Sequence, residues 1–176
     1  TGSDNFAENS TSNVTDVNSS DEDSDTVTYS KSGADEGDFN IDSGTGVLTF
    51  KSAPNFEIPT DADLNNTYIV IITATDDGAG TLTDTQTLTI TVTDVNEVPT
   101  DMALSSSSVN ENESSGTTVG AISSTDVDAG DSHTYTLVSG TGSTDNASFQ
   151  ISSSNLLTNA VFNFESQSSY SIRIRT

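Results

Sequence analysis

Two neighbouring stretches of the sequence alternate between apolar and polar residues with the period of a β-strand. In residues 68–74 every second side chain is aromatic or aliphatic and most of the others are apolar too, which indicates a strand covered on both faces. In residues 81–93 threonine occupies every second position. The apolar residues of the opposite face are Leu82, Leu88, Ile90 and Val92. Gly78 and Gly80 lie between the two stretches and favour a turn, so we predict a β-hairpin.

Short features of the first half of the chain recur in the second half, in the same order and about a hundred residues later. They are Glu8-Asn9 with Glu111-Asn112, Asp21-x-Asp23 with Asp126-x-Asp128, Val27-Thr28-Tyr29 with Thr134-Tyr135, Phe39-Asn40-Ile41 with Phe149-Gln150-Ile151, Asn55-Phe56-Glu57 with Asn163-Phe164-Glu165, and the strand patterns that begin at Tyr68 and Tyr170. No stretch carries the apolar stripe of an amphipathic helix, so two all-β modules are predicted, residues 1–98 and 99–176.

The second module reaches no counterpart of residues 81–93, so we expect it to lack its last strand and the chain to be part of a longer protein. Phenylalanines expected in the cores are Phe6, Phe39, Phe149, Phe162 and Phe164.

The composition is strongly acidic, with 27 Asp and Glu against 4 Lys and Arg and a net charge of −23. Such a charge repels phosphate, which argues against nucleic acid as a partner. No apolar run is long enough to enter a membrane, and no signal peptide is visible. This balance fits either a disordered acidic tail or a thin β protein whose charge is neutralised by a ligand, and the alternating strands favour the second. Without cysteine, disulfides cannot supply the missing stability, and the absence of Cys together with a single His argues against structural zinc. A hard cation such as Ca²⁺ is the remaining candidate.

The acidic residues collect where the alternating strands end. Ca²⁺ takes six to eight oxygen ligands, and converging loops at one end of a β module can supply them. The candidate ligands, from both modules and the segment that joins them, are Glu8, Glu57, Asp94, Asn96, Glu97, Asp126 and Asp128. The alternative is that these acids only keep a thin β protein soluble.

These acidic motifs resemble the calcium motifs of cadherin repeats. The matching segments are Glu8-Asn9, Asp21-x-Asp23, Asn55-Phe56-Glu57, Ala74-Thr75-Asp76 and Asp94-Val95-Asn96-Glu97-x-Pro99. The resemblance implies two tandem Greek-key β-sandwiches related to immunoglobulin-like domains, with Ca²⁺ ions between successive repeats. It assigns to the half-site for an upstream repeat Asp21, Asp23 and Asp76. It assigns to the central junction the residues Glu8, Asn55, Glu57, Asp94, Asn96, Glu97, Asp126 and Asp128. The Asn-Glu-x-Pro ending and the segment from Asp126 to Asp131 are similar to those of bacterial members of the family, which are found in very large surface proteins.

The sequence departs from the family pattern at two places. Glu97 and Val98 replace the last two residues of the usual linker motif Asp-x-Asn-Asp-Asn. Asn55 stands where the family usually has an aspartate, and Asn163 does so in the second module. An amide oxygen can bind Ca²⁺ but carries no charge, so the ion nearest Asn55 is expected to be held more weakly.

The resemblance implies a structural role, as a calcium-stiffened stalk or spacer of an extracellular bacterial surface protein, or as an adhesive segment. The expected partners are neighbouring repeats of the same chain and other cell-surface proteins or glycans, with no insertion into a membrane. A calcium-dependent carbohydrate-binding module is the alternative, although the chain has no Trp and its tyrosines fall within strand patterns. No enzymatic activity is expected, because His133 has no nucleophile motif such as G-x-S-x-G near it.

Overall fold

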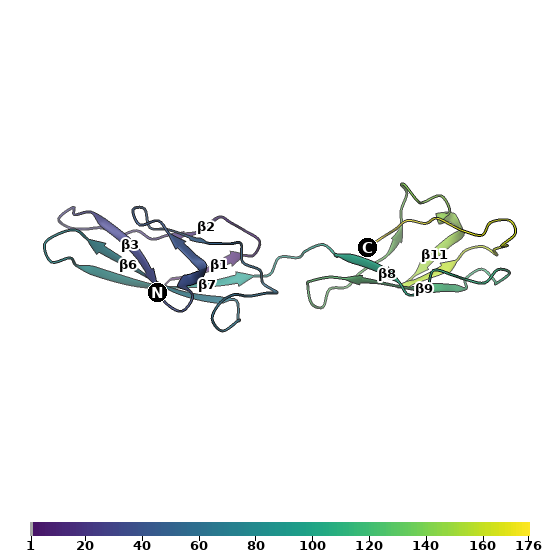
Figure 1. The fold of residues 1–176 in the computed structure, drawn as a ribbon, viewed down its shortest axis with the longest axis horizontal. Coiled ribbons are helices and arrows are strands. Elements are labelled where there is room, and N and C mark those ends of the chain that lie inside the picture. The colour runs from purple at the N-terminus through teal and green to yellow at the C-terminus, as the bar shows by residue number, and fades with distance from the viewer. Residues whose placement is uncertain (1) are drawn as a thin grey trace. The chain divides into compact units, whose positions relative to one another are not determined.

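The computed structural model describes residues 2–176, which divide into two compact units on either side of the Val95–Asn96 bond (Figure 1). Apart from two short 3₁₀ turns, Glu36–Asp38 (η1) and Asn146–Ser148 (η2), the regular elements are strands. The all-β fold predicted from the alternation is therefore confirmed. Within residues 2–176 no helix is long and apolar enough to cross a membrane.

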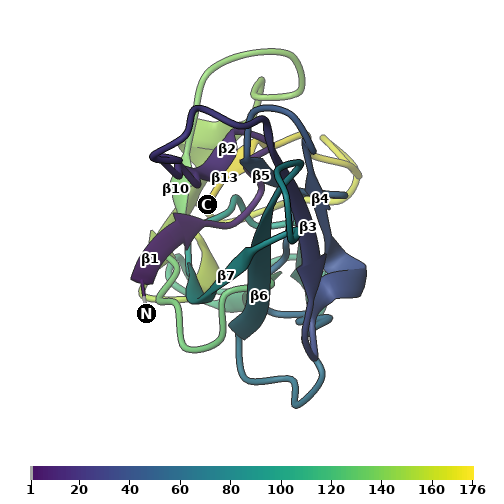
Figure 2. The ribbon, with the colours of Figure 1, turned by 90° about the vertical axis from the view of Figure 1, so that its left-hand side faces the viewer.

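The described part of the first unit has seven strands, arranged in two sheets. They are β1 (Gly2–Ala7), β2 (Asn13–Asp16), β3 (Val27–Ser32), β4 (Phe39–Ile41), β5 (Val47–Phe50), β6 (Thr67–Asp76) and β7 (Thr83–Thr93). One sheet has the order β1-β7-β6-β3, and the other has the order β2-β5-β4. Figure 2 shows β7, β6 and β3 side by side in the first of these sheets. Among the strand pairs of residues 2–95, only the pairing of β1 with β7 is parallel.

The hairpin of β6 and β7 has the faces that the alternation predicts, with one exception. Leu88, Ile90 and Val92 are buried, while the threonines between them lie half-buried on the opposite face. Leu82 was expected on the buried face, but that prediction is wrong because Leu82 lies in the turn before β7 and is 71% exposed. Its backbone N–H donates to the Asp76 carboxylate, which holds this residue in the turn rather than in the strand.

Aromatic side chains from both sheets meet in the core of the first unit. The ring centroids of Phe39 and Phe50 lie 4.4 Å apart, and Tyr68 from the other sheet meets Phe50 edge-on at 5.1 Å. Aromatic pairs at such distances and angles stabilise a core beyond the area that they bury. Phe6 of β1 belongs to the same buried cluster. The first strand is therefore fixed to the body of the unit by packing as well as by its pairing with β7.

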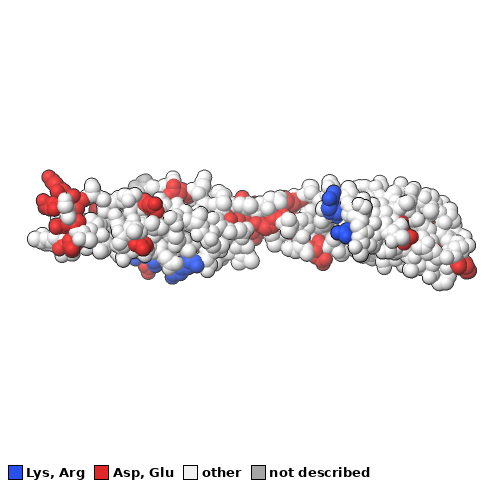
Figure 3. All heavy atoms as spheres, turned by 90° about the horizontal axis from the view of Figure 1, so that it is seen from above, with Lys and Arg blue, Asp and Glu red and all other residues white. Residues whose placement is uncertain are grey.

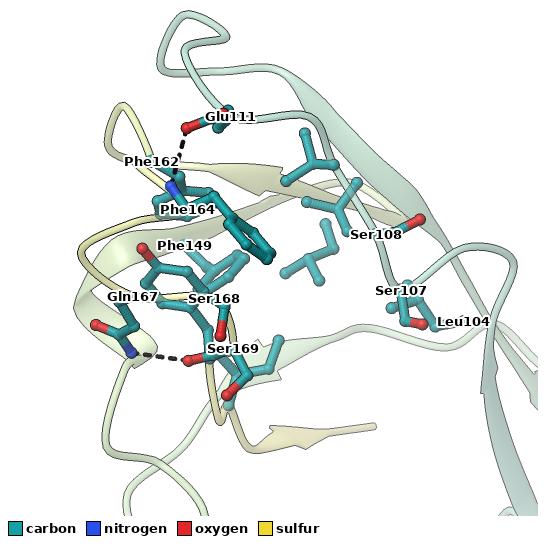
Figure 4. A pocket seen from close by; sticks show the side chains of 15 residues that line it. Leu104, Ser107, Ser108, Glu111, Phe149, Phe162, Phe164, Gln167, Ser168 and Ser169 are labelled. Carbon is teal, nitrogen blue, oxygen red and sulfur yellow. Dashed lines mark hydrogen bonds between the residues drawn. The ribbon is translucent and has the colours of Figure 1, made fainter.

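The second unit is built from shorter strands. They are β8 (Asp101–Leu104), β9 (Thr118–Thr125), β10 (Thr136–Leu137), β11 (Phe149–Ser152), β12 (Asn155–Thr158) and β13 (Ile174–Arg175). One sheet has the order β11-β12-β9-β8, and β10 pairs with β13. Phe149 and Phe162 are buried as predicted, but Phe164 is 63% exposed, so its assignment to the core is wrong. Its backbone N–H is bonded to Glu111, and its ring lines the rim of a hollow in the surface (Figure 4).

That hollow is a cavity of about 440 Å³, lined largely by apolar side chains such as Val109, Phe162, Tyr170 and Ile172. The repeat aligns Tyr170 and Ile172 with Tyr68 and Val70 of the first unit, both of which are covered there by the core that contains β7. In residues 96–176 no strand occupies the position that β7 has in the first unit. Phe164 lines the same cavity.

This difference predicts unequal protection of two equivalent backbone segments. Strand β6 pairs with a strand on each side, whereas β13 pairs only with β10 among the described residues. The amides of Ile172 and Ile174 should exchange with solvent at least roughly tenfold faster than those of Val70 and Ile72. Hydrogen–deuterium exchange followed by NMR on this chain would measure the four rates. Equal protection would mean that the second sheet is closed in solution.

Candidate metal centre

The pairing of β1 with β7 brings two acidic residues together at one end of the first unit. Because the strands run parallel with Ala7 opposite Thr93, the next residues, Glu8 and Asp94, leave the sheet at the same end. Glu57 reaches this end from the loop after β5, which is tied to β1 by the bond from Asn9 N–H to the Pro54 carbonyl. Carboxylate oxygens of Glu8, Glu57 and Asp94 lie within 4.8 Å of one another.

Glu8 is the buried member of this group and is 3% exposed. One of its oxygens accepts the N–H of Phe56 at 2.8 Å, and the other accepts the N–H of Val95 at 2.9 Å. Glu8 therefore connects three segments of the first unit: the end of β1, the loop after β5 and the first residue beyond Asp94.

A second group of carboxylates lies on the loop that follows β9, within the second unit. Oxygens of Asp126, Asp128 and Asp131 lie within 4.8 Å of one another. Asp128 is 9% exposed, and its Oδ2 accepts the N–H of Glu97 at 2.8 Å. The other oxygen, Oδ1, is buried and has no hydrogen-bond partner among residues 2–176. Each group thus includes a buried carboxylate that binds the backbone of the segment between β7 and β8.

Both groups fit the coordination chemistry of Ca²⁺. Two oxygens that each lie about 2.4 Å from one ion can be at most about 4.8 Å apart. The carboxylate oxygens of each group lie within 4.8 Å of one another. All six ligands are carboxylates, the oxygen donors that a hard divalent cation prefers. The buried Oδ1 of Asp128 adds an independent indication, because a buried charged oxygen without a partner is costly unless a cation is bound to it.

The structure does not bring the predicted half-site together in the same way. In the described chain, Asp21, Asp23 and Asp76 do not belong to any such group of three. Asp21 Oδ1 instead accepts the N–H groups of Asp23 and Asp25, and the Asp76 carboxylate accepts those of Gly78 and Leu82. The assignment of these residues to a half-site stays a prediction.

The end of the first unit that carries these residues is nevertheless strongly acidic, as the space-filling view shows at its left-hand side (Figure 3). Partial desolvation, and then the negative charges of Asp21, Asp77 and Asp76, raise the pKa of Asp25 above its ordinary value. The negative charges of these turns therefore repel one another. A bound cation would relieve this repulsion.

The two asparagines among the candidates have other bonds. Asn55 Oδ1 accepts the N–H of Ile58 at 2.6 Å and closes a turn, as Asn163 does with Ser166 in the second unit at 3.0 Å. The Asn96 side chain donates to the Glu97 carbonyl at 2.8 Å. Their roles as calcium ligands stay predictions, and for Asn55 the ligand would be an oxygen that already accepts one hydrogen bond.

Two buried acids and one exposed acid did not emerge as candidates from the sequence. Asp35 and Asp61 are buried, but their oxygens accept backbone N–H groups of the loop between β5 and β6 and so hold that loop. Asp131 joins Asp126 and Asp128 in the second group. Two sequence signals point to Asp131: it ends the segment from Asp126 to Asp131 that resembles bacterial members, and it directly follows Gly130, whose positive φ turns the chain back towards the preceding aspartates.

Replacing Glu8 by glutamine should destabilise the first unit even in the absence of metal. The amide group of glutamine presents N–H to one of the two backbone donors that Glu8 now accepts, so the free energy of unfolding should fall by about 1–3 kcal/mol. Urea unfolding in EDTA would measure the loss. The matched control is Glu111→Gln, because the exposed Glu111 accepts the equivalent N–H of Phe164 and should lose less. Equal losses in the two variants would contradict the central role of Glu8.

The comparisons with known proteins agree with the fold and the acidic motifs. The family model described as the cadherin domain matches residues 5–93. Among solved structures, EC1-2 of human protocadherin-24 is 19% identical with a TM-score of 0.65, and the match covers 99% of this chain and 90% of that one. Drosophila N-cadherin EC1-4 is 22% identical with a TM-score of 0.63, and the match covers 94% of this chain and 40% of that one.

The extracellular domain of protocadherin gammaB4 is 25% identical with a TM-score of 0.64, and the match covers 98% of this chain and 27% of that one. This chain thus spans most of the protocadherin-24 fragment but less than half of the two longer structures. No curated protein sequence gives a match. The structural matches establish the fold, and the family model covers about half of the sequence. The chain belongs to the cadherin family.

Proposed function

We propose that residues 1–98 and 99–176 are two tandem repeats of an extracellular bacterial surface protein, and that Ca²⁺ stiffens the segment between them. One observation carries the proposal: the segment between β7 and β8 is held at both ends by buried carboxylates that belong to acidic groups. Glu8 accepts the N–H of Val95, and Asp128 accepts the N–H of Glu97. The role is that of a stalk or spacer that presents other domains, or of an adhesive segment.

The stiffening follows from what the ion would neutralise. Without a cation, the carboxylates of each group repel one another, and this repulsion weakens the hold of Glu8 and Asp128 on the backbone. Ca²⁺ at Glu8, Glu57 and Asp94 would fix the start of the segment to the first unit. Ca²⁺ at Asp128 and its neighbours would fix the segment near Glu97 to the second unit. Because ion binding requires the folded arrangement of ligands, its free energy adds to folding stability.

A bacterial surface location is supported by the linker ending Asn96-Glu97-x-Pro99 and by the loop from Asp126 to Asp131, which resemble bacterial members of the family. The proposed partners are neighbouring repeats of the same chain and other cell-surface proteins or glycans. A non-enzymatic role accords with the family. The acidic charge of −23 disfavours nucleic acid.

A calcium-dependent carbohydrate-binding role has one observation in its favour, the exposed ring of Phe164 at the rim of the second unit's cavity. Sugars stack on such rings. The cavity wall, however, consists of residues whose counterparts Tyr68 and Val70 form the core of the first unit, which favours an interpretation as open core. A glycan array probed with and without chelator separates the two roles, since chelator-sensitive binding would favour the carbohydrate role.

Calcium should raise the thermal stability of this chain. An ion at a hundredfold excess over its Kd contributes about 2.7 kcal/mol, which for units of this size raises Tm by roughly 10 °C or more. Calorimetry in millimolar CaCl₂ and in EDTA, with MgCl₂ at equal ionic strength as the control for general screening, measures the shift. A Tm that is the same in CaCl₂ and EDTA would show that the calcium proposal is wrong.

Asn55→Asp should tighten the ion held by the Glu8, Glu57 and Asp94 group. The new carboxylate still accepts the N–H of Ile58, so the turn is kept, while a charged ligand adds about 1–2 kcal/mol to the binding free energy. Calorimetric titration with Ca²⁺ measures the change. Asn163→Asp makes the same replacement in the equivalent turn and should leave that ion unaffected. If Asn55→Asp leaves stoichiometry and affinity unchanged, Asn55 is not a ligand.

A further inference from the structure

The loop after β9 gathers three carboxylates from six consecutive residues, all within the second unit. Asp126 follows the last residue of β9 directly. The N–H of Asp128 donates to the Oδ1 of Asp126 at 3.4 Å. Gly130 has a φ of +100°, and the N–H of Asp131 meets the Asp128 carbonyl at 3.4 Å. This turn returns the chain on itself and places a carboxylate oxygen of Asp131 within 4.8 Å of those of Asp126 and Asp128.

A second observation indicates that these three carboxylates suit a cation site and are not merely acidic side chains exposed to solvent. Asp128 is 9% exposed, and its Oδ1 is buried without a hydrogen-bond partner among residues 2–176. Its Oδ2 is already bonded to the N–H of Glu97. A bound cation would stabilise a buried carboxylate oxygen that lies beside two further carboxylates and accepts no hydrogen bond.

The equivalent loop of the first unit lacks this arrangement. The repeat aligns Asp21 and Asp23 with Asp126 and Asp128, and Thr26 stands where the second unit has Asp131. The N–H of Thr26 donates to Asp77, and Asp21 Oδ1 is bonded to two N–H groups of its own loop. The two loops share the paired aspartates but differ at this third position. The third carboxylate is therefore a property of the second loop.

We propose that Asp131 is a ligand of a Ca²⁺ ion that loop 126–131 holds within the second unit. This inference rests on the proposed calcium function and adds one ligand residue to it. The three carboxylates lie on one loop of the second unit.

The test is calorimetric titration of the full chain with Ca²⁺, for the wild type, Asp131→Asn and the control Asp101→Asn, an exposed aspartate on β8. Asp131 is exposed, so its replacement should leave the fold intact, which circular dichroism checks. Asp131→Asn should lose one site or weaken it roughly tenfold or more, and Asp101→Asn should match the wild type. In a Glu8→Gln chain the same site should still bind, and adding Asp131→Asn should weaken it by the same factor.

The outcomes separate this inference from the broader proposal. A wild-type chain that takes up no Ca²⁺ would overturn both. Normal uptake by the wild type with unchanged stoichiometry and affinity in Asp131→Asn would overturn the role of Asp131 alone. An independent measurement on the wild type uses NMR: the amide signals of Gly130 and Asp131 should shift on addition of Ca²⁺, and unshifted signals would also overturn the role of Asp131.

Discussion

The parallel pairing of β1 with β7 is the constraint on which the acidic arrangement of the first unit depends. Because Ala7 lies opposite Thr93, Glu8 and Asp94 leave the sheet together, and the packing of Phe6 in the core fixes this register. A slip by one residue would turn every side chain of β1 to the other face. The buried position of Glu8, and with it the bond to Val95, would be lost. Core packing and the acidic group are therefore consequences of a single register.

A chain with so few apolar residues must also accommodate a large excess of negative charge. The sequence has only Lys31, Lys51, Arg173 and Arg175 to set against 27 acidic residues. Several carboxylates accept hydrogen bonds from backbone N–H groups in turns, as Asp21 and Asp76 do. Such bonds do not remove the repulsion where three carboxylates meet. A divalent cation at those places would relieve the repulsion, and it would also give the buried Oδ1 of Asp128 a partner.

The sequence predicted the all-β fold and the repeat because a period of two determines which side of a strand each residue faces. It could not predict where each core ends, which is why Leu82 and Phe164 were wrongly assigned to buried positions. Glu8 and Asp94 could be proposed together because both stand at strand ends in recognisable motifs. The bonds that occupy Asp21 and Asn55 depend on local turn geometry, and Asp131 depends on the turn at Gly130, so none of the three followed from residue type alone.

Stiffening of the segment between β7 and β8 by Ca²⁺ is the central claim, and ¹⁵N relaxation of its backbone amides tests it most directly. The amides of Val95, Asn96, Glu97 and Val98 would be compared with those of β6 in the same sample, first in EDTA and then in CaCl₂. The account predicts order parameters below about 0.6 in EDTA and close to about 0.85, the value of rigid backbone, in CaCl₂. Order parameters that stay below about 0.6 in saturating CaCl₂ would contradict it.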